Sequence, residues 1–467
     1  MKNGRFLQWR SMAMAALLLG LQACANKTVP ETEPLPNIIF ILTDDQRWDA
    51  LAYAGNPIIH TPQMDRLAAS GLYFPNAFVT TPICAASRAS LFTGLYERTH
   101  DYTFGKPALE NRHMEQSYPF LLKKAGYHTG FVGKFGVKVN EGITDSLFHT
   151  FEPTWYPYFV EREGEQVHLA DVHGDLAIDY IRSNKEKPFC LSLSFWSPHA
   201  NDDEEQQYFW PEYCDSLYMD VEIPTPETAD PAFFEALPDF LKTTMNRKRW
   251  YWRYDTPEKH QEMVKGYYRM ISGVDSVIGR IRATLKEEGL AENTVIILMG
   301  DNGYFLGERG YAGKWLMHEP SLRVPLIIYD PRQPDSRRGL SPEAMALNVD
   351  VTPTILSLAG VDIPGGYHGE SLTVFAEGDP EGWRTGFFCE HRLENNELLP
   401  KTEAYRDEQW KFIRYENQPD LEELYHYKED IHEILNLAGD ENYSDLLAHY
   451  RRKCDSVAHI LEAESLR

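Results

Sequence analysis

Runs of apolar and β-branched residues recur along the chain at 37–43, 189–195, 294–299 and 324–329. Runs that are apolar at every position suit strands buried on both faces of a parallel sheet. Helix-like stretches lie between them at 61–70, 118–125 and 261–288. Because strands and helices alternate, the pattern predicts an α/β fold with a large, mostly parallel sheet covered by helices on both sides.

The pattern changes after about Leu372. Shorter units at 383–390, 404–415 and 422–427 predict an antiparallel sheet, and 443–466 predicts a final helix. We therefore expect a main domain over 37–372 and a smaller C-terminal α+β subdomain over 373–467.

Polar residues follow three of the predicted strands. They are Asp44-Asp45, His199 and Asp301-Asn302. In open α/β sheets, ligands bind beyond the carboxyl ends of the strands, so we expect these side chains to meet in one site. An isolated Asp-Asp pair is more often a helix cap or a turn, and the prediction depends on the pairs acting together.

The N-terminus has the pattern of a targeting segment. Lys2, Arg5 and Arg10 precede a short apolar stretch over 12–21, and Leu21-Gln22-Ala23-Cys24 resembles a bacterial lipobox. We expect 1–24 to be a lipoprotein signal with Cys24 lipidated, and 25–36 to be a tether. The alternative is an ordinary cleaved signal. The first interpretation predicts an exported lipoprotein, anchored to a membrane on the periplasmic side or at the cell surface.

The net charge and the cysteine content of the chain restrict the partners and metal sites that we expect. Lys+Arg 46 against Asp+Glu 70 gives a formal net charge of −24, which argues against a nucleic-acid partner. Beyond Cys24 an odd number of cysteines remains, so at least one is expected outside any disulfide, and no spaced cysteine pairs indicate a structural zinc site.

The sharpest motif is the segment 82–94, PICAASRASLFTG. It resembles the signature of type I sulfatases, which share the alkaline-phosphatase-like fold. The resemblance implies a large mixed, mostly parallel β-sheet sandwiched by helices, with a smaller C-terminal antiparallel-sheet subdomain. The resemblance implies that a sulfatase-maturating enzyme oxidises Cys84 to formylglycine (3-oxoalanine). A helix starting near Cys84 would direct its N-terminal N–H groups at a sulfate, and Arg88 would lie one turn further on. The alternative for an isolated cysteine is a buried core residue.

Other segments extend the resemblance over roughly 36–437. Asp44, Asp45, Asp301 and Asn302 resemble the family's metal ligands and, with modified Cys84, imply one Ca²⁺ per chain. Gly133-Lys134, Pro198-His199 and Gly313-Lys314 resemble further elements. They nominate Lys134, His199 and Lys314 as catalytic residues beside Cys84 and Arg88.

The resemblance implies a sulfuric ester hydrolase that removes sulfate from a carbohydrate, such as ulvan or a glycosaminoglycan. A hydroxyl of hydrated formylglycine would attack sulfur while Arg88, Lys134 and Lys314 neutralise the sulfuryl oxygens. His199 or Lys314 would protonate the leaving alcohol. Two alternatives stay open: a phosphonate or phosphate ester hydrolase of the same superfold, and an inactive glycan-binding lipoprotein.

One position departs from the family. Gly136 stands where the family commonly has histidine. Either His199 takes over more of the proton transfer, or His100 or His318 fills the gap. If His199 covers the role, Gly136→His should change the rate only modestly.

Substrate contacts are predicted from position and composition. The segment 246–255, NRKRWYWRYD, mixes basic and aromatic residues as a sugar subsite would, although a surface helix has the same composition. The residues expected to face the substrate are Arg47, Trp48, Arg98, His100, Arg253 and His318.

Overall fold

The computed structural model describes residues 34–393 and 399–465, so the predicted signal, lipobox and tether lie almost wholly outside the described residues. Its centre is a seven-stranded sheet in the order β2-β12-β9-β1-β8-β4-β5. The strands in that order are β2 (Leu72–Tyr73), β12 (Leu326–Tyr329), β9 (Thr294–Gly300), β1 (Asn37–Thr43), β8 (Phe189–Ser194), β4 (His128–Gly133) and β5 (Thr150–Pro153). From β9 to β5 every neighbouring pair is parallel.

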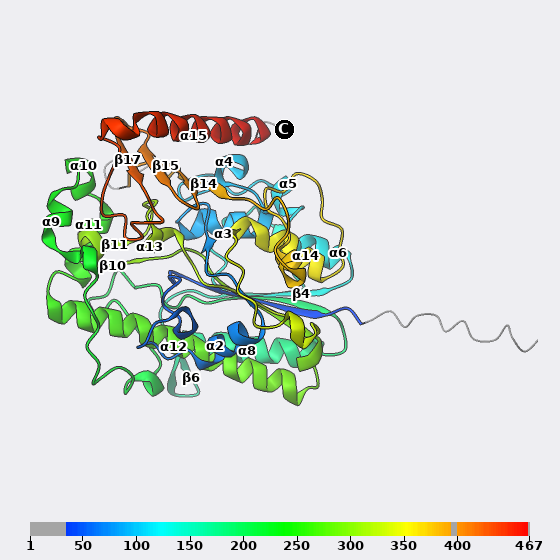
Figure 1. Cartoon of the computed structure of the whole chain (residues 1–467). Helices are drawn as coiled ribbons and strands as arrows, with labels where there is room; N and C mark the ends of the chain where they lie inside the picture. The colour runs from blue at the N-terminus through cyan, green and yellow to red at the C-terminus, as the bar shows by residue number, and fades with distance from the viewer. Residues whose placement is uncertain (1–33, 394–398, 466–467) are drawn as a thin grey trace, which may run out of the picture. The chain divides into compact units, whose positions relative to one another are not determined.

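Helices cover both faces of this sheet (Figure 1). One face packs against α2 (Pro62–Ser70), α8 (Leu169–Asn184) and α12 (Pro257–Glu287), and the other against α3 (Cys84–Thr93), α6 (Tyr118–Lys124) and α14 (Val351–Leu358). Side chains of a strand alternate between faces, so Ile38 and Phe40 of β1 join one hydrophobic cluster and Ile39 and Ile41 the other. The predicted α/β sandwich is therefore confirmed.

The sheet includes one strand whose direction its apolar pattern did not predict. β12 pairs antiparallel with β9, and β2 pairs antiparallel with β12. An antiparallel neighbour needs no crossover, so the connection from β9 to β12 starts and ends at the same edge of the sheet. That connection, 301–325, therefore stays at the edge where Asp301 begins it.

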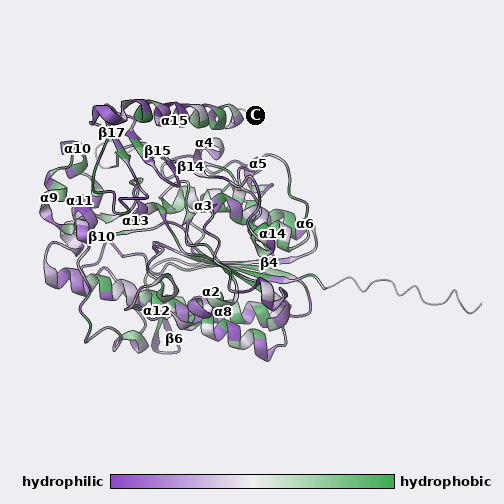
Figure 2. Cartoon of the chain, in the orientation of Figure 1, coloured by the Kyte–Doolittle hydropathy of each residue, from purple (hydrophilic) through white to green (hydrophobic). Residues whose placement is uncertain are grey.

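Short strand pairs and short helices lie around the central sheet (Figure 2). The small strand pairs are β3 (Ala77–Phe78) with β13 (Ala346–Leu347), β6 (Phe159–Arg162) with β7 (Glu165–His168), and β10 (Phe305–Leu306) with β11 (Ala312–Gly313). The remaining helices are α4 (Glu97–His100), α5 (Asn111–Met114), α7 (Ile143–Leu147), α9 (Pro231–Glu235), α10 (Asp239–Lys242), α11 (Met245–Arg253) and α13 (Glu319–Leu322).

The C-terminal part forms a four-stranded antiparallel sheet followed by a helix. The strands are β14 (Gly386–His391), β15 (Thr402–Asp407), β16 (Lys411–Tyr415) and β17 (Gln418–Tyr425), and the helix is α15 (Ser444–Ser465). The unit expected at 404–415 is two strands, because Asp407 accepts bonds from the backbone N–H groups of Gln409 and Trp410 and closes a turn. The antiparallel subdomain is otherwise as predicted.

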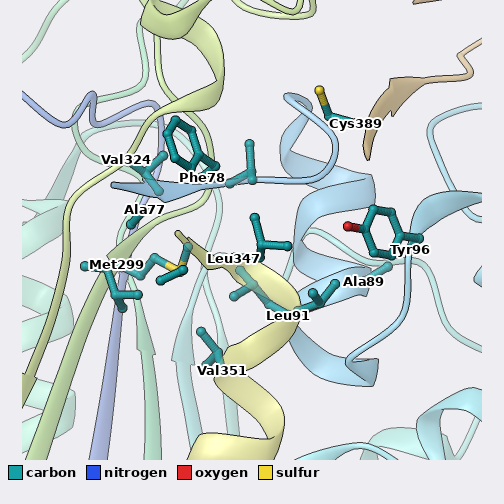
Figure 3. Packing of buried hydrophobic residues seen from close by; sticks show 14 of the residues in the cluster. Ala77, Phe78, Ala89, Leu91, Tyr96, Met299, Val324, Leu347, Val351 and Cys389 are labelled. Atoms are coloured by element: carbon teal, nitrogen blue, oxygen red, sulfur yellow. The ribbon is translucent and has the colours of Figure 1, made fainter. Parts of the chain in front are cut away.

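Helix α3 is buried along its whole length. Figure 3 shows Ala89 and Leu91 of this helix packed near Leu347 and Val351. Small residues on α3 let neighbouring segments approach closely. The helix start at Cys84 is consequently held by the core rather than by solvent-exposed contacts.

All five cysteines of the described residues are buried free thiols, so the expected unpaired cysteine is accompanied by four others. Within 34–393 and 399–465, the chain has no helix that is both long and apolar enough to cross a membrane.

Candidate active site

The candidate site lies at the carboxyl ends of the parallel strands. Asp44 and Asp45 follow β1, Lys134 follows β4, and Asp301 and Asn302 follow β9. His199 comes a few residues after β8. Because β1, β4, β8 and β9 run in one direction, their ends place these side chains at a single edge of the sheet.

Acidic and amide side chains form the floor of the site. The Asn302 side chain donates a hydrogen bond to Asp45 Oδ1 at 2.6 Å, and the Asp45 backbone N–H donates to Asp301 Oδ1 at 3.1 Å. Three buried oxygens, Asp44 Oδ1, Asp45 Oδ2 and Asn302 Oδ1, have no hydrogen-bond partner within the described residues. One oxygen each of Asp44 and Asp45 and a ring nitrogen of His199 lie within 4.8 Å of one another. Such orphaned oxygens fit a hard divalent cation.

Three basic side chains converge on this floor. Lys134 Nζ contacts Asp44, and Lys314 Nζ contacts Asp45. Arg88 Nε donates to Asp301 Oδ2 at 2.8 Å, and its Nη1 donates to the Lys134 carbonyl oxygen at 2.6 Å. All three cationic side chains are buried, so each is positioned by an acidic partner.

The cluster shifts the pKa values of its members. Burial alone would raise the pKa of Asp44, but the charges of Lys134, Lys314 and Arg88 lower it below its ordinary value. Burial alone would lower the pKa of Lys314, but the Asp45 carboxylate raises it well above its ordinary value. Both groups are therefore held in their charged forms.

Cys84 is the first residue of α3, and its thiol is buried. The residue before it, Ile83, is extended and accepts the first intrahelical bond from Ser87 N–H at 2.9 Å. The N–H groups of the first helical turn and the Arg88 guanidinium one turn on lie on the same helix as Cys84. This arrangement favours an anion beside Cys84.

His199 is fixed through its Nδ1 atom. Nδ1 lies 2.6 Å from the Ala200 carbonyl oxygen and 2.9 Å from the Tyr156 hydroxyl. Because a carbonyl oxygen only accepts, Nδ1 carries a proton, and the Nε2 lone pair faces Asp45 Oδ2 at 3.7 Å. Burial lowers the pKa of His199 to about 4. The histidine is thus neutral, with Nε2 directed at the site.

Gly136 has a structural requirement that its sequence context did not reveal. Its φ is +71°, and a Cβ built there would lie 2.6 Å from Arg88 Cδ and 3.2 Å from Arg88 Nε. Arg88 is anchored by several hydrogen bonds and has little freedom to move. A side chain at position 136 would displace Arg88, so from the structure we expect Gly136→His to lower the rate by more than the modest change expected from the sequence.

Arg47 and Trp48 lie beside the site but face a different space. Arg47 pairs with Asp49 and, at 2.5 Å, with Glu308, and the Arg323 guanidinium lies 4.1 Å from the centre of the Trp48 ring. Both line a cavity of about 510 Å³ to which none of the five predicted catalytic side chains contributes. Their predicted contact with substrate gains no support from this placement.

Arg98, His100 and His318 make contacts inside the protein. Arg98 pairs with Glu390 at 2.8 Å, and His318 Nε2 lies 3.2 Å from Glu423, so both link the main domain to the C-terminal sheet. His100 is buried, with Nε2 3.1 Å from Ser90 Oγ. These contacts give each side chain a structural role, and none of them reaches the acidic floor.

The segment 246–255 packs against the residues around Lys314. Asn246, fully buried in α11, donates to the Lys314 carbonyl oxygen at 2.8 Å, and the Arg249 guanidinium lies 4.6 Å from the Trp315 ring centre. Arg249 and Arg253 both pair with Asp202. Arg253 is fully buried, so the structure gives it a scaffolding position rather than the predicted substrate-facing one.

Sequence reasoning did not find Tyr156, Ser194 and Asn246. Ser194 accepts a bond from Arg88, Tyr156 touches His199, and Asn246 holds Lys314. Ser194, the last residue of β8, had a signal because it ends an apolar strand at the functional edge. Asn246 begins the basic and aromatic segment 246–255, but that composition did not indicate a contact with Lys314.

The segment around Lys314 is also linked to the C-terminal subdomain. Glu319 of α13, buried, accepts bonds from Arg406 Nε at 3.1 Å and Lys411 Nζ at 2.7 Å, from β15 and β16. Arg309 donates to the Glu433 carbonyl oxygen. The segment that carries Lys314 is therefore held by α11 on one side and by the C-terminal sheet on the other.

Comparisons with known proteins agree with this geometry. The sulfatase family model matches residues 36–361, and a model described as the C-terminal part of N-sulphoglucosamine sulphohydrolase matches 307–459. An N-acetylglucosamine-6-O-sulfatase from Bacteroides thetaiotaomicron is 28% identical, with 91% of this chain and 86% of the relative covered.

Solved structures share the fold. One, of a protein in complex with its substrate D-glucosamine-2-N,6-O-disulfate, superposes with a TM-score of 0.75 at 24% identity, covering 92% of this chain and 98% of that one. A phosphonate monoester hydrolase from Silicibacter pomeroyi gives 0.76 at 22% identity, covering 90% and 94%. Since the sulfatase model matches well over half of the residues, the chain belongs to the sulfatase family, the sulfuric ester hydrolases.

Proposed function

We propose that this enzyme removes sulfate ester groups from a sulfated carbohydrate, with Cys84 as the precursor of a formylglycine nucleophile and one Ca²⁺ ion as cofactor. The observation that carries the proposal is the convergence of Arg88, Lys134 and Lys314 on one acidic floor beside the start of α3. Three buried cationic side chains next to a helix N-terminus offer hydrogen-bond donors that suit a sulfuryl group.

The residues present fit a calcium ion. Asp44, Asp45, Asp301 and Asn302 would hold it, because their oxygens are hard donors and three oxygens of this set are buried without a partner in the described chain. Bound there, Ca²⁺ would supply positive charge to the sulfuryl oxygens and lower the pKa of a hydroxyl beside it.

Cys84 fits the role of nucleophile precursor. It opens a buried helix, and Arg88 holds Asp301 from the same helix face one turn later. The hydrated aldehyde would supply one hydroxyl to attack sulfur and a second whose deprotonation releases sulfate.

The remaining residues divide the work. Lys134, Lys314 and Arg88 would bind and orient the sulfuryl oxygens. His199 Nε2, the nitrogen directed at the site, carries a lone pair, so it would first take up a proton, such as that of the attacking hydroxyl, and then pass it to the leaving alcohol. The bond from Nδ1 to Ala200 keeps the ring in place. Lys314 is the second candidate for that proton.

The carbohydrate assignment draws on the relatives, among them the N-acetylglucosamine-6-O-sulfatase that matches most of this chain. Phosphonate or phosphate ester hydrolysis is the second candidate, because a phosphonate monoester hydrolase has the same fold. An inactive glycan-binding protein is the third.

The test is made on protein co-expressed with a sulfatase-maturating enzyme. Mass spectrometry of the peptide containing Cys84 should show the mass decrease of a thiol replaced by an aldehyde. Free sulfate is then measured on sulfated glucosamine saccharides, glycosaminoglycan fragments and ulvan fragments, and phenyl phosphonate serves as the competing ester.

Cys84→Ala should abolish sulfate release, whereas Cys214→Ala, which removes another buried free thiol, should not. Faster turnover of the phosphonate than of every sulfate ester would favour the second candidate. Unmodified Cys84 with no release of sulfate, despite an active maturating enzyme, would favour the binding protein.

We also propose that the protein is exported and lipidated at Cys24, on the periplasmic side or at the cell surface. The support is the sequence pattern of residues 1–24. Membrane fractionation of cells expressing the whole chain should find it in the membrane fraction, and Cys24→Ala should move it to the soluble fraction. Equal distribution of the two proteins would contradict the anchor.

A further inference from the structure

Three aromatic side chains gather at the functional edge of the sheet. Trp155 and Tyr156 follow β5, and Trp196 follows β8. The ring centres of Trp155 and Trp196 are 5.9 Å apart, and those of Tyr156 and Trp196 are 4.4 Å apart. The three rings therefore form one contiguous aromatic surface, which we call the aromatic platform.

The platform touches the catalytic machinery directly. Lys134 Nζ lies 4.5 Å from the Trp196 ring centre, and the Tyr156 hydroxyl lies 2.9 Å from His199 Nδ1. Trp155 packs against Trp196, which contacts Lys134, and Tyr156 of the same platform contacts His199. In the proposed function, both Lys134 and His199 act on the sulfate ester. A group bound on Trp155 would lie next to the sulfuryl position.

Trp155 is the outermost part of the platform. It is 68% exposed, more than any other large hydrophobic side chain of the described residues, whereas Trp196 is 6% exposed. Trp48, Trp196 and Trp315 each have a cation close to the ring, but no cation of the described residues lies over Trp155. Its indole therefore presents free apolar surface to a ligand.

The backbone that carries Trp155 is fixed. The Trp196 indole N–H donates to the Thr154 carbonyl oxygen at 2.9 Å, and the Thr154 backbone N–H donates to the Gly133 carbonyl oxygen at 2.9 Å. The Thr154 hydroxyl lies 2.7 Å from His173 Nε2. An exposed ring on an anchored backbone loses little freedom when a ligand stacks on it, which favours binding.

We propose that Trp155 forms a subsite on which a pyranose ring of the substrate stacks. The C–H groups of a pyranose carry partial positive charge, and the face of an indole is negative, so the two surfaces attract and exclude water. The subsite rests on the proposed function, because the carbohydrate substrate supplies the pyranose. It makes Trp155 a specificity-determining residue rather than a catalytic one.

The kinetic test compares Trp155→Ala and Trp155→Phe with the unsubstituted enzyme on a sulfated glucosamine disaccharide, with inorganic sulfate as an inhibitor that has no ring. Trp155→Ala should raise KM for the disaccharide about tenfold and leave kcat within about twofold, which is the size of a lost stacking contact. Trp155→Phe should restore most of the affinity. The inhibition constant for inorganic sulfate should stay unchanged in both variants.

Tyr213→Ala is the matched control, because Tyr213 is also an exposed aromatic, 53% exposed, but is hydrogen-bonded to Asp171 of α8. It should leave KM unchanged. An unchanged KM in Trp155→Ala would overturn the subsite. So would an equal loss in kcat and in sulfate inhibition, which would show a structural role.

Calorimetric binding of the same disaccharide to Cys84→Ala and to Cys84→Ala/Trp155→Ala separates the two proposals. If the unsubstituted enzyme releases no sulfate but binding depends on Trp155, the proposed function fails and the subsite stands. If sulfate is released and binding ignores Trp155, the subsite fails alone. If there is neither release nor binding, both fail.

Discussion

The Cα of Gly136 lies so close to Arg88 that a Cβ added there would approach Arg88 Cδ to 2.6 Å. Gly136→Ala should therefore lower kcat/KM about tenfold to a hundredfold by pushing Arg88 away from Asp301, and Gly136→His should lower it further. Steady-state kinetics on matured protein measure the effect.

The control for backbone strain is Gly142→Ala. Gly142 has a similar φ of +81°, but a Cβ there meets no atom within 4 Å. Both alanine variants should lose about 1 kcal/mol of unfolding free energy to the left-handed backbone, and only the Gly136 variant should lose activity. Equal activity in the two would contradict the role of Arg88.

Asn246→Ala should lower kcat about tenfold, because the Lys314 carbonyl oxygen loses its donor and the lysine is no longer fixed. Asn184→Ala removes the same kind of bond, from Asn184 Nδ2 to the Tyr180 carbonyl oxygen at 2.8 Å, at the end of α8. If both variants lose equal stability and equal activity, Asn246 has no special link to Lys314.

Removal of divalent cations should lower both activity and thermal stability, since ligands that bind only the folded state stabilise it. Added Ca²⁺ should raise the Tm of the chelator-treated enzyme. Asn302→Ala should abolish this rise, because it removes one of the orphaned buried oxygens. Asp230→Ala, which changes an N-cap of α9, should keep it. An equal Ca²⁺-dependent shift in Asn302→Ala would place the ion elsewhere.

Acid should destabilise the protein through buried histidines. Burial lowers the pKa of His100 to about 3, below its ordinary value of 6.5. The unfolded chain therefore binds a proton there between pH 6.5 and about 3 while the folded chain does not, so the free energy of unfolding falls as pH falls through this window.

His100→Gln should reduce that dependence by about 1.4 kcal/mol per pH unit near pH 5. Urea unfolding at several pH values measures the slope. His459→Gln, at an exposed position of α15, is the control and should leave the slope unchanged. A slope identical to that of the unsubstituted protein in His100→Gln would refute the argument.

The sequence predicted the strand ends of the site well and its surroundings poorly, for a physical reason. Asp44, Asp45, Asp301 and Asn302 come directly after apolar strands, so local pattern and sheet topology together place them. Arg98 pairs with Glu390 and His318 pairs with Glu423, and both partners are far away in the sequence. The sequence around Arg98 and His318 does not indicate these contacts. It therefore could not show that these residues have structural partners rather than a substrate to bind.

The same distinction applies to the sheet and to Trp155. An apolar run gives no strand direction, so the antiparallel β12 became apparent only from its pairing with β9. Trp155 lies in a short loop with no motif around it, and its importance comes from a ring contact with Trp196, forty-one positions later.

Glu319, Arg406 and Lys411 make the small sheet a fixed partner of the segment that carries Lys314. Exchanging C-terminal subdomains among relatives to create hybrid enzymes would separate these buried charges from their counterparts. In a functional hybrid, the two parental sequences would need to be joined before Lys314 rather than at the start of the small sheet. Lys314 and the strands that hold its segment would then come from the same parent.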